Sequence, residues 1–297
     1  MFLSGYLTES IKNKKYTNEV IKHLPEERHH NLAINAVCPY FTMYPLDFPL
    51  AVLEKNALTD QWVLDPFCGR GTTNLAARLL GMGSVGIDSS QVAVAIAKAK
   101  LAVSSPRRVI RVAQRILSEW VDPNCIPEGP FWRWAFHEST LRAICKLRES
   151  LRQECRSQAG ILLRAILLGA LHGPLTKNTP SYLSNQSPRT FSPKPGYAVK
   201  YWQAREMRPP KIDVLSVIRK RTERYLKNQL PKTEGFIRCD DSRRIATLDI
   251  KKRFDWIVTS PPFFGMRTYI PDQWLRAWFL GGPDHVEYKQ PETQLSH

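Results

Sequence analysis

The chain has 297 residues, with 43 Lys or Arg against 27 Asp or Glu, so its formal net charge at pH 7 is +16. This length holds one large domain or two ordinary ones with an ample core, and a hydrophobic content of 43% excludes a mainly disordered chain. The charge predicts a polyanionic partner, most simply nucleic acid, although a merely basic surface would give the same count.

The six cysteines form no CxxC pair and show no zinc-ligand spacing. Because no secretory leader is recognisable, we expect reduced thiols in a cytoplasmic protein without a metal site. The longest apolar stretch, 161–171, contains Arg164 and is too short to cross a bilayer. It predicts a buried helix and no membrane partner.

Residues 1–36 are polar and mixed, typical of a solvated leader or of an arm that touches DNA. Residues 38–49 (CPYFTMYPLDFP) then alternate aromatic rings with prolines, which stop regular structure and hold the rings on a constrained loop. These rings either pack against a ligand or close the core. Pro49 suits the first turn of a helix that follows.

The most informative stretch is 65–73, DPFCGRGTT. It lies between an apolar run at 62–64, which predicts a buried strand, and helix-forming residues at 74–80. A strand, a glycine turn and a helix make the ligand-binding corner of an α/β sheet, where glycines admit a ligand and the helix N-terminus offers amide donors. An ordinary βα turn has the same outline. Asn74 stands where the dinucleotide pattern has its third glycine, which argues against NAD.

A second predicted strand, 84–88, ends at Asp88, followed by a helix at 91–101 that Ser89 and Ser90 cap. Asp88 lies roughly 20 residues past the glycine turn, where an acid can bind both ribose hydroxyls. A helix cap is the alternative role for this carboxylate.

No strand signal appears from 106 to 232. Helices are predicted at 139–155, 161–171 and 214–230, with a long loop at 172–211 that interleaves cations with aromatic residues. Cations contact phosphates and rings stack on unpaired bases, so this loop predicts nucleic-acid contacts. The alternative is a long surface loop that is fixed to the protein and contacts no nucleic acid. The predicted contact residues are Lys177, Arg189, Lys194, Lys200 and Arg205, and the interleaved rings are Tyr182, Phe191, Tyr197, Tyr201 and Trp202.

Strand signals return at 235–239, before Asp240 and Asp241, and at 254–258, before TSPPFFG at 259–265. Two prolines after a strand stop sheet pairing and make the loop rigid. The alternative is a Pro-Pro turn with a purely structural role.

The pair of motifs, DPFCGRGTT at 65–73 and TSPPF at 259–263, resembles the S-adenosylmethionine-dependent DNA methyltransferases that methylate base amines. In that family Ser-Pro-Pro-aromatic is more typical of enzymes acting on cytosine N4, and Asp-Pro-Pro-Tyr of those acting on adenine N6. The similarity covers about 38–96 and 236–282. It implies a Rossmann-like α/β sheet with helices on both faces.

The resemblance also implies that the chain is divided into three parts with different roles. Residues 1–105 would form an N-terminal arm and the cofactor-binding half, 106–232 a helical, basic insertion for target recognition, and 233–297 the catalytic part. The implied partner is double-stranded DNA, with a companion restriction enzyme as a possible second one, and no metal is required.

The implied reaction is site-specific transfer of a methyl group from S-adenosylmethionine to an exocyclic amine, most simply cytosine N4. Ser260 and Pro261 would hold the amine, Pro262 would fix the turn, and Phe263 would stack on a flipped base. Asp88 would take the ribose and Asp241 the adenine amine, with Asp240 as the alternative. The full set of implied cofactor contacts is Tyr40, Phe41, Thr42, Asp65, Pro66, Phe67, Gly69, Gly71, Thr72, Asp88 and Asp241.

Three alternatives stay open: adenine-N6 methylation, RNA base methylation, and an inactive remnant that binds cofactor or DNA. Methylation of a ring carbon through a cysteine nucleophile is excluded, since it needs a Pro-Cys pair where Pro262 follows Pro261.

The resemblance has one departure. Only four strands are predicted, and one helix, 273–280, follows the second motif, whereas the family's sheet continues with further strands. We therefore expect an incomplete sheet with its fourth strand near an exposed edge. A fragment, strands borrowed from a partner, and lost activity would each account for it.

Overall fold

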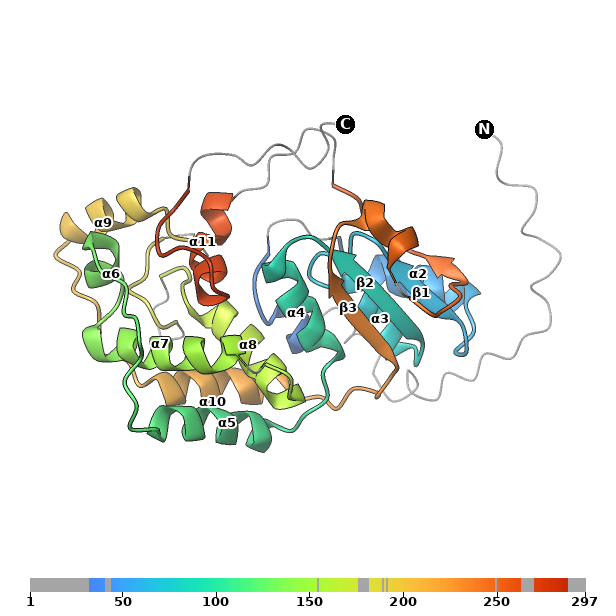
Figure 1. The fold of residues 1–297 in the computed structure, drawn as a ribbon, viewed down its shortest axis with the longest axis horizontal. Helices are drawn as coiled ribbons and strands as arrows, with labels where there is room; N and C mark the ends of the chain where they lie inside the picture. The colour runs from blue at the N-terminus through green and yellow to red at the C-terminus, as the bar shows by residue number, and fades with distance from the viewer. Residues whose placement is uncertain are drawn as a thin grey trace.

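The computed structural model describes residues 32–40, 44–153, 155–175, 182–188, 190, 192–248, 250–262 and 270–287. Their centre is a four-stranded sheet with the order β3-β2-β1-β4 (Figure 1). The strands are β1 (Trp62–Asp65), β2 (Gly83–Asp88), β3 (Gly235–Cys239) and β4 (Trp256–Ile257). All four predicted strands are confirmed, although β4 is shorter than the predicted 254–258.

Every strand pair in the sheet is parallel. Leu64 of β1 lies opposite Val85 of β2 on one side and Ile257 of β4 on the other. From β1 the chain first adds β2 and β3 on one side and then returns to place β4 on the other. The crevice beyond the carboxyl ends of β1 and β4 is therefore a topological switch point, where open α/β sheets bind their ligands.

The two faces of the sheet are covered differently. Helices α3 (Thr72–Leu79) and α4 (Gln91–Leu101) cover one face, and α2 (Asp47–Asn56) packs behind α3. On the other face Val85 and Ile87 pack against Ile245 of the 3-10 helix η3 (Ser242–Thr247) and against the segment that follows it. The α/β class is thus confirmed, with a 3-10 helix in place of an α-helix on the second face among the described residues.

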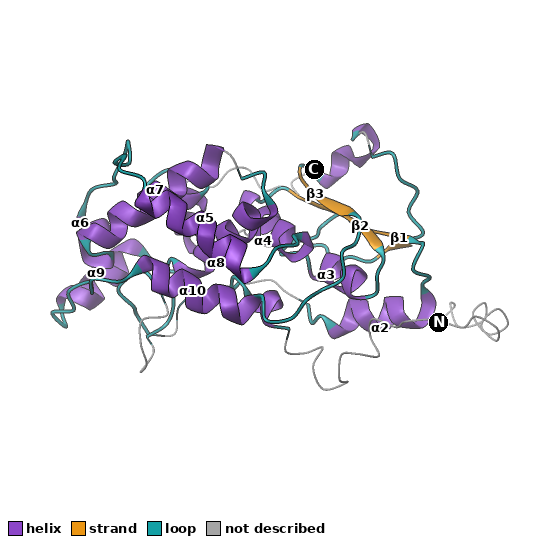
Figure 2. Ribbon diagram, turned by 90° about the horizontal axis from the view of Figure 1, so that it is seen from below, coloured by secondary structure: helices purple, strands orange, loops and turns teal. Residues whose placement is uncertain are grey.

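A mainly helical unit occupies 106–232, beside the sheet (Figure 2). It consists of α5 (Pro106–Ser118), α6 (Pro130–Ala135), α7 (Glu138–Gln153), α8 (Gln158–Ala170), α9 (Pro195–Gln203) and α10 (Val214–Tyr225). The buried helix predicted at 161–171 is α8, which packs against α4, α5 and α10 and so joins the unit to the sheet's helices. None of the described helices is long and apolar enough to span a membrane.

Two expectations for this unit were wrong in detail. The loop predicted at 172–211 contains helix α9, and the basic helix ends at Tyr225 rather than at 230. Trp202, predicted to stack on bases, is fully buried and donates its indole N–H to the carbonyl of Gln186 over 2.9 Å. On an amphipathic helix this ring serves the core and is not available to a ligand.

Two further segments of the chain, one before and one after the sheet, pack against the helical unit. The short 3-10 helix η2 (Ala33–Ala36) packs against α10. Helix α11 (Ile270–Phe279) begins three residues before the predicted 273–280 and brings Trp274 and Trp278 against Trp132 of α6. The neighbouring Arg148 donates to the carbonyl of Trp278 over 2.8 Å. Both ends of the described chain are therefore anchored on the helices.

β4 forms the outer strand of the sheet within the described chain, and the Ile257 side chain is 66% exposed. The expectation that the fourth strand lies at an exposed edge is confirmed.

The first testable consequence concerns two glycines of the turn after β1. Gly71 has φ +74°, and a Cβ there would lie 2.9 Å from the Ala97 Cα of α4, whereas Gly69 has φ +50° and open space around it. Gly69→Ala should cost about 1–2 kcal/mol for the left-handed backbone. Gly71→Ala adds a backbone clash and should cost clearly more, measured by urea unfolding. Equal costs would mean that the α3–α4 contact does not constrain the turn.

Candidate active site

The carboxylate of Asp65 links the two sequence motifs. Asp65 ends β1 and is fully buried, and its Oδ1 accepts the Phe67 N–H over 3.1 Å and the Thr259 hydroxyl over 2.7 Å. Thr259 follows β4, so this bond joins residues 194 positions apart at the switch point. Burial raises the pKa of Asp65, and these hydrogen bonds oppose the rise.

The second oxygen of the same carboxylate is unusual. Asp65 Oδ2 is buried and, by distance and angle, accepts no hydrogen bond from the described residues. The nearby Thr73 hydroxyl nevertheless opposes the rise in the pKa of Asp65 that burial causes, and burial and then the Asp65 carboxylate raise the pKa of Tyr44. A buried acceptor without a donor is costly, and the cost disappears if a ligand supplies an N–H or O–H group. The orphan oxygen therefore suits a cationic or amine-bearing ligand at the carboxyl end of β1.

Asp88 closes the glycine turn from the neighbouring strand. Its Oδ2 accepts the Gly69 N–H over 2.9 Å, and its Oδ1 accepts the Ser90 N–H over 2.8 Å. Burial raises the pKa of Asp88, while the two bonds lower it. The Asp88 side chain thus braces the turn, whereas Ser90 caps α4 by accepting the Ala93 N–H over 3.3 Å. Each carboxylate oxygen has a second acceptor site, so a ribose contact remains compatible with this geometry.

Two tyrosines from the Pro-rich segment reach the same strand ends. The Tyr44 hydroxyl hydrogen-bonds with the Thr73 hydroxyl, which donates to the carbonyl of Val258 over 3.2 Å. Tyr40 hydrogen-bonds Ser90 near Asp88, and burial, followed by the Asp88 charge, raises its pKa to about 12. Tyr40 and Tyr44 of this segment therefore lie at the carboxyl ends of the strands.

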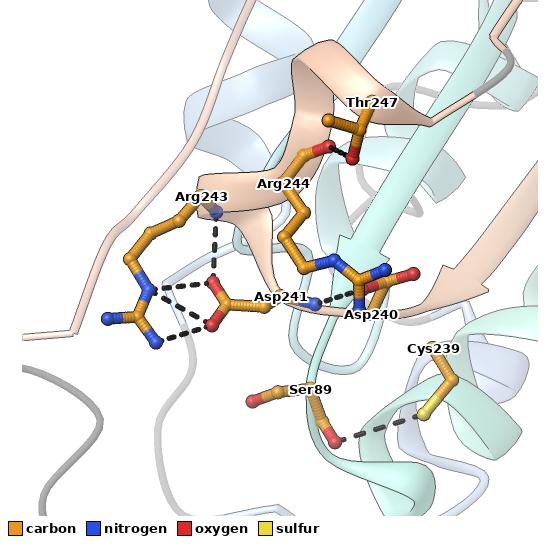
Figure 3. A network of polar contacts seen from close by, with 7 residues as sticks. All are labelled: Ser89, Cys239, Asp240, Asp241, Arg243, Arg244 and Thr247. Atoms are coloured by element: carbon orange, nitrogen blue, oxygen red, sulfur yellow. Dashed lines mark hydrogen bonds and ion pairs between the residues drawn. The ribbon is translucent and has the colours of Figure 1, made fainter.

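The acids after β3 are both engaged in ion pairs (Figure 3). Asp241 accepts three bonds from the Arg243 guanidinium, at 2.6, 3.0 and 3.1 Å, and one from the Arg243 N–H at 2.9 Å, and these lower its pKa. Asp240 pairs with Arg244 over 3.3 Å, and its N–H donates to the carbonyl of Asp88 over 3.1 Å. Both acids lie beside the end of β2, and Asp240 has the less exposed side chain, 22% against 36%.

The remaining predicted residues fall into three groups. Ser260, Pro261 and Pro262 are exposed on the loop after β4, open to a large substrate. Pro66 and Phe67 are half-buried, and Thr72 is buried at the start of α3. Outside the described residues lie Phe41, Thr42, Lys177, Arg189 and Phe263.

The predicted nucleic-acid contacts that are described lie on and around α9. Lys194, Lys200 and Arg205 are exposed. The Arg205 guanidinium lies 4.1 Å from the centre of the Tyr201 ring, which stacks on Tyr197 with the ring centres 6.3 Å apart. Cations and accessible rings thus share one surface.

Sequence inspection overlooked several residues of this site. Thr73 and Thr259 lie inside the two motifs, and their polar side chains at strand ends could have identified them. Arg70 is a second case: its guanidinium and the Lys100 ammonium each donate to Asn35 Oδ1 over 2.8 Å. Burial lowers the pKa of Arg70 to about 10 and that of Lys100 well below its usual value. No local sequence pattern predicts that Asn35, which lies on η2, accepts these two hydrogen bonds.

Together these features define the class of protein: a Rossmann-like α/β fold with a polar site at the switch point. A sequence-family comparison finds that residues 7–99 match a family described as DNA methylase. The chain is 42% identical over 64 residues to the Type II methyltransferase M.ScaI of Streptomyces caespitosus, covering 20% of this chain and 21% of that protein. It is 39% identical over 62 residues to the Type II methyltransferase M2.LlaDCHI of Lactococcus lactis subsp. cremoris, covering 20% and 23%.

The N-terminal part of the chain, residues 7–99, is therefore similar to the DNA methylase family and to these Type II methyltransferases. The matched segments span about a fifth of the length of these curated relatives.

Asp65→Asn tests the buried carboxylate. Because burial raises the pKa of Asp65 in the folded protein, its charge destabilises the fold above that pKa and has no effect below the unfolded pKa of about 3.9. We expect the variant, without ligand, to melt a few degrees higher than wild type at pH 7 by calorimetry, with the difference vanishing near pH 3.

The matched control is Asp255→Asn, an exposed carboxylate that accepts the Trp62 N–H over 3.0 Å on the same sheet. It should show no such gain. A lower melting temperature for Asp65→Asn at pH 7 would mean that the hydrogen bonds of the charged form outweigh its desolvation.

Proposed function

We propose that this protein transfers a methyl group from S-adenosylmethionine to an exocyclic base amine in double-stranded DNA, with cytosine N4 favoured over adenine N6. The single observation that carries the proposal is the Asp65–Thr259 hydrogen bond. It brings the glycine motif and the Ser-Pro-Pro motif together across β1 and β4, at the point where this fold class binds ligands. The family match supports the class of reaction.

The residues at the strand ends fit the cofactor. The orphan Oδ2 of Asp65 would accept from the ammonium of the amino-acid end, Asp88 would take the ribose, and Tyr40 would cover them. Asp241 remains the proposed partner of the adenine amine, with Asp240 as the alternative, since each carboxylate has acceptor capacity beyond its arginine. When bound, the cofactor supplies an electrophilic methyl group on a sulfonium.

The exposed loop after β4 would receive the base. An exocyclic amine is a poor nucleophile because its lone pair is delocalised into the ring. The Ser260 hydroxyl and the Pro261 carbonyl would accept its N–H groups and bias the nitrogen toward tetrahedral geometry. Pro262 would hold this turn rigid, and Phe263 would stack on the flipped base. Ser260, in place of the acid typical of adenine enzymes, favours cytosine N4.

The helical unit would recognise the DNA. Lys194, Lys200 and Arg205 surround the Tyr197–Tyr201 stack on α9, and Lys177 and Arg189 belong to the same basic stretch of sequence. Cations of this kind bind the DNA backbone and set the register of the enzyme on the duplex. Target recognition is thus proposed for 106–232, with the contacts to the target duplex on and around α9, cofactor binding for 1–105 and catalysis for 233–297. A cytoplasmic protein with a companion restriction enzyme accords with the Type II relatives.

The proposal is tested by incubating the protein with methyl-labelled S-adenosylmethionine and either duplex DNA or tRNA, followed by nucleoside analysis. We expect N4-methylcytosine from the DNA. Labelled N6-methyladenine would reassign the base, and label in tRNA alone would refute the DNA assignment. Cofactor binding without transfer to either nucleic acid would instead identify an inactive remnant.

Ser260→Ala separates catalysis from cofactor binding. Because Ser260 is assigned to the target amine, the variant should lose at least about a hundredfold in methyl transfer, the usual scale for one positioned polar group. Its affinity for S-adenosylmethionine, measured by calorimetry, should remain within about twofold of wild type. An equal loss of cofactor affinity would refute the role given to Ser260.

A further inference from the structure

Helix α5 carries a row of arginines that the proposed reaction does not use. Val109, Ala113 and Ile116 face the core, Val112 and Leu117 pack at its edge, and the opposite side of the helix is exposed. Four arginines lie on this exposed side: Arg107, Arg108, Arg111 and Arg115. Three of them are spaced four residues apart, which places them on one face at intervals of about 6 Å along the axis.

Negative charge is nearly missing from this surface. Helix α5 contains no acidic residue, and its four arginines form no ion pair among the described residues. Helix α10 packs against α5 and adds the exposed Arg219 and Arg224. Its acids are Glu223 and, at the N-cap, Asp213, whose pKa is lowered by hydrogen bonds from Ser216 and further by the Arg219 charge. We call the six arginines the α5–α10 basic face.

Such an arrangement is unfavourable for the isolated protein. Like charges four residues apart on a helix repel one another, and an ordinary solvated surface intersperses both signs. A row of like-charged guanidinium groups at regular spacing complements a polymer of regularly spaced anions, and arginine binds phosphate with two parallel N–H donors.

The position of this face separates it from the proposed reaction. In Figure 1, α5 and α10 lie along the lower side of the molecule, whereas α9, α11 and the 3-10 helix after β3 lie along the upper side. Figure 2, seen from below, shows α5 and α10 side by side. The basic face is thus directed away from the strand ends that carry Asp88 and Asp241.

We propose that the α5–α10 basic face binds the sugar–phosphate backbone of a second segment of duplex DNA, distinct from the segment that presents the target base. This goes beyond the proposed function, since methyl transfer requires only the upper side. Two such surfaces let one molecule hold two DNA segments. The interaction is with phosphates and is independent of sequence.

The test measures how many short duplexes one chain binds at low salt, by sedimentation with a fluorescent duplex. Wild type should bind two. The triple variant Arg107→Gln, Arg111→Gln, Arg115→Gln should bind one duplex under the same conditions. Its weakened binding of the second duplex should depend less on salt: the slope of log K against log salt should decrease in magnitude by about 2.7, at about 0.9 per phosphate contact. Its methyl transfer to a short duplex at saturation should equal that of wild type.

Two matched variants control the result. The triple Arg→Lys variant at the same positions keeps the charge and should still bind two duplexes. The triple variant Lys194→Gln, Lys200→Gln, Arg205→Gln should keep the α5–α10 site while weakening the other. All the substituted residues are exposed, so every variant should retain the circular dichroism and melting temperature of wild type.

One duplex bound by wild type, or two bound by the α5 glutamine variant, would overturn the proposal. So would displacement of the second duplex by poly-glutamate as readily as by unlabelled DNA, because that would identify a site for acidic protein. Absence of methyl transfer by wild type and by every variant, with two duplexes still bound by wild type, would refute the proposed function and leave this inference standing.

Discussion

The rest of the structure depends on the burial of one carboxylate at the end of the central strand. Asp65 has no exposure, and its Oδ1 is shared between the turn that follows β1 and the hydroxyl that follows β4. A buried charge is stable only if it is hydrogen-bonded, so the glycine turn and the loop after β4 are constrained together. Thr73 adds a second link by donating to the carbonyl of Val258. The two motifs are therefore parts of one rigid site.

Charged side chains of both signs surround this carboxylate. Asp88 holds the turn through backbone amides, and Asp240 and Asp241 at the next strand end are held by arginines. Beneath the turn, Arg70 and Lys100 are buried against one amide oxygen. These charges fix the geometry before any ligand arrives, which is what a site that aligns two reactants needs. The exposed cations are distributed differently, on α9 above and on α5 and α10 below.

Different segments cover the two faces of the sheet, according to where each segment makes apolar contacts. Helices α3 and α4 cover one face, and the other is closed by η3 and the segment after it. The central helix α8 then packs against α4, so the helical unit shares its core with the helices that cover the sheet. Because α11 returns to this core through its tryptophans, the loop after β4 is held at both ends.

Local sequence determined the strands, the glycine turn and the helix caps. Apolar runs and left-handed glycines are short-range signals, as Gly69, Gly71 and the cap at Ser90 illustrate. The aromatic and cationic composition of 172–211 predicted a surface, and it did not separate Tyr197, which is exposed, from Trp202, which is buried. The partners of Asp65 and Arg70 depended on tertiary structure, because Thr259 and Asn35 are distant in sequence and meet these residues only once the sheet and helices pack. The acids at 88, 240 and 241 were visible in the chain, and Ser90, Arg243 and Arg244, which they hold, lie only two to four residues away. The bond from the Gly69 N–H to Asp88 forms only when β1 and β2 pair.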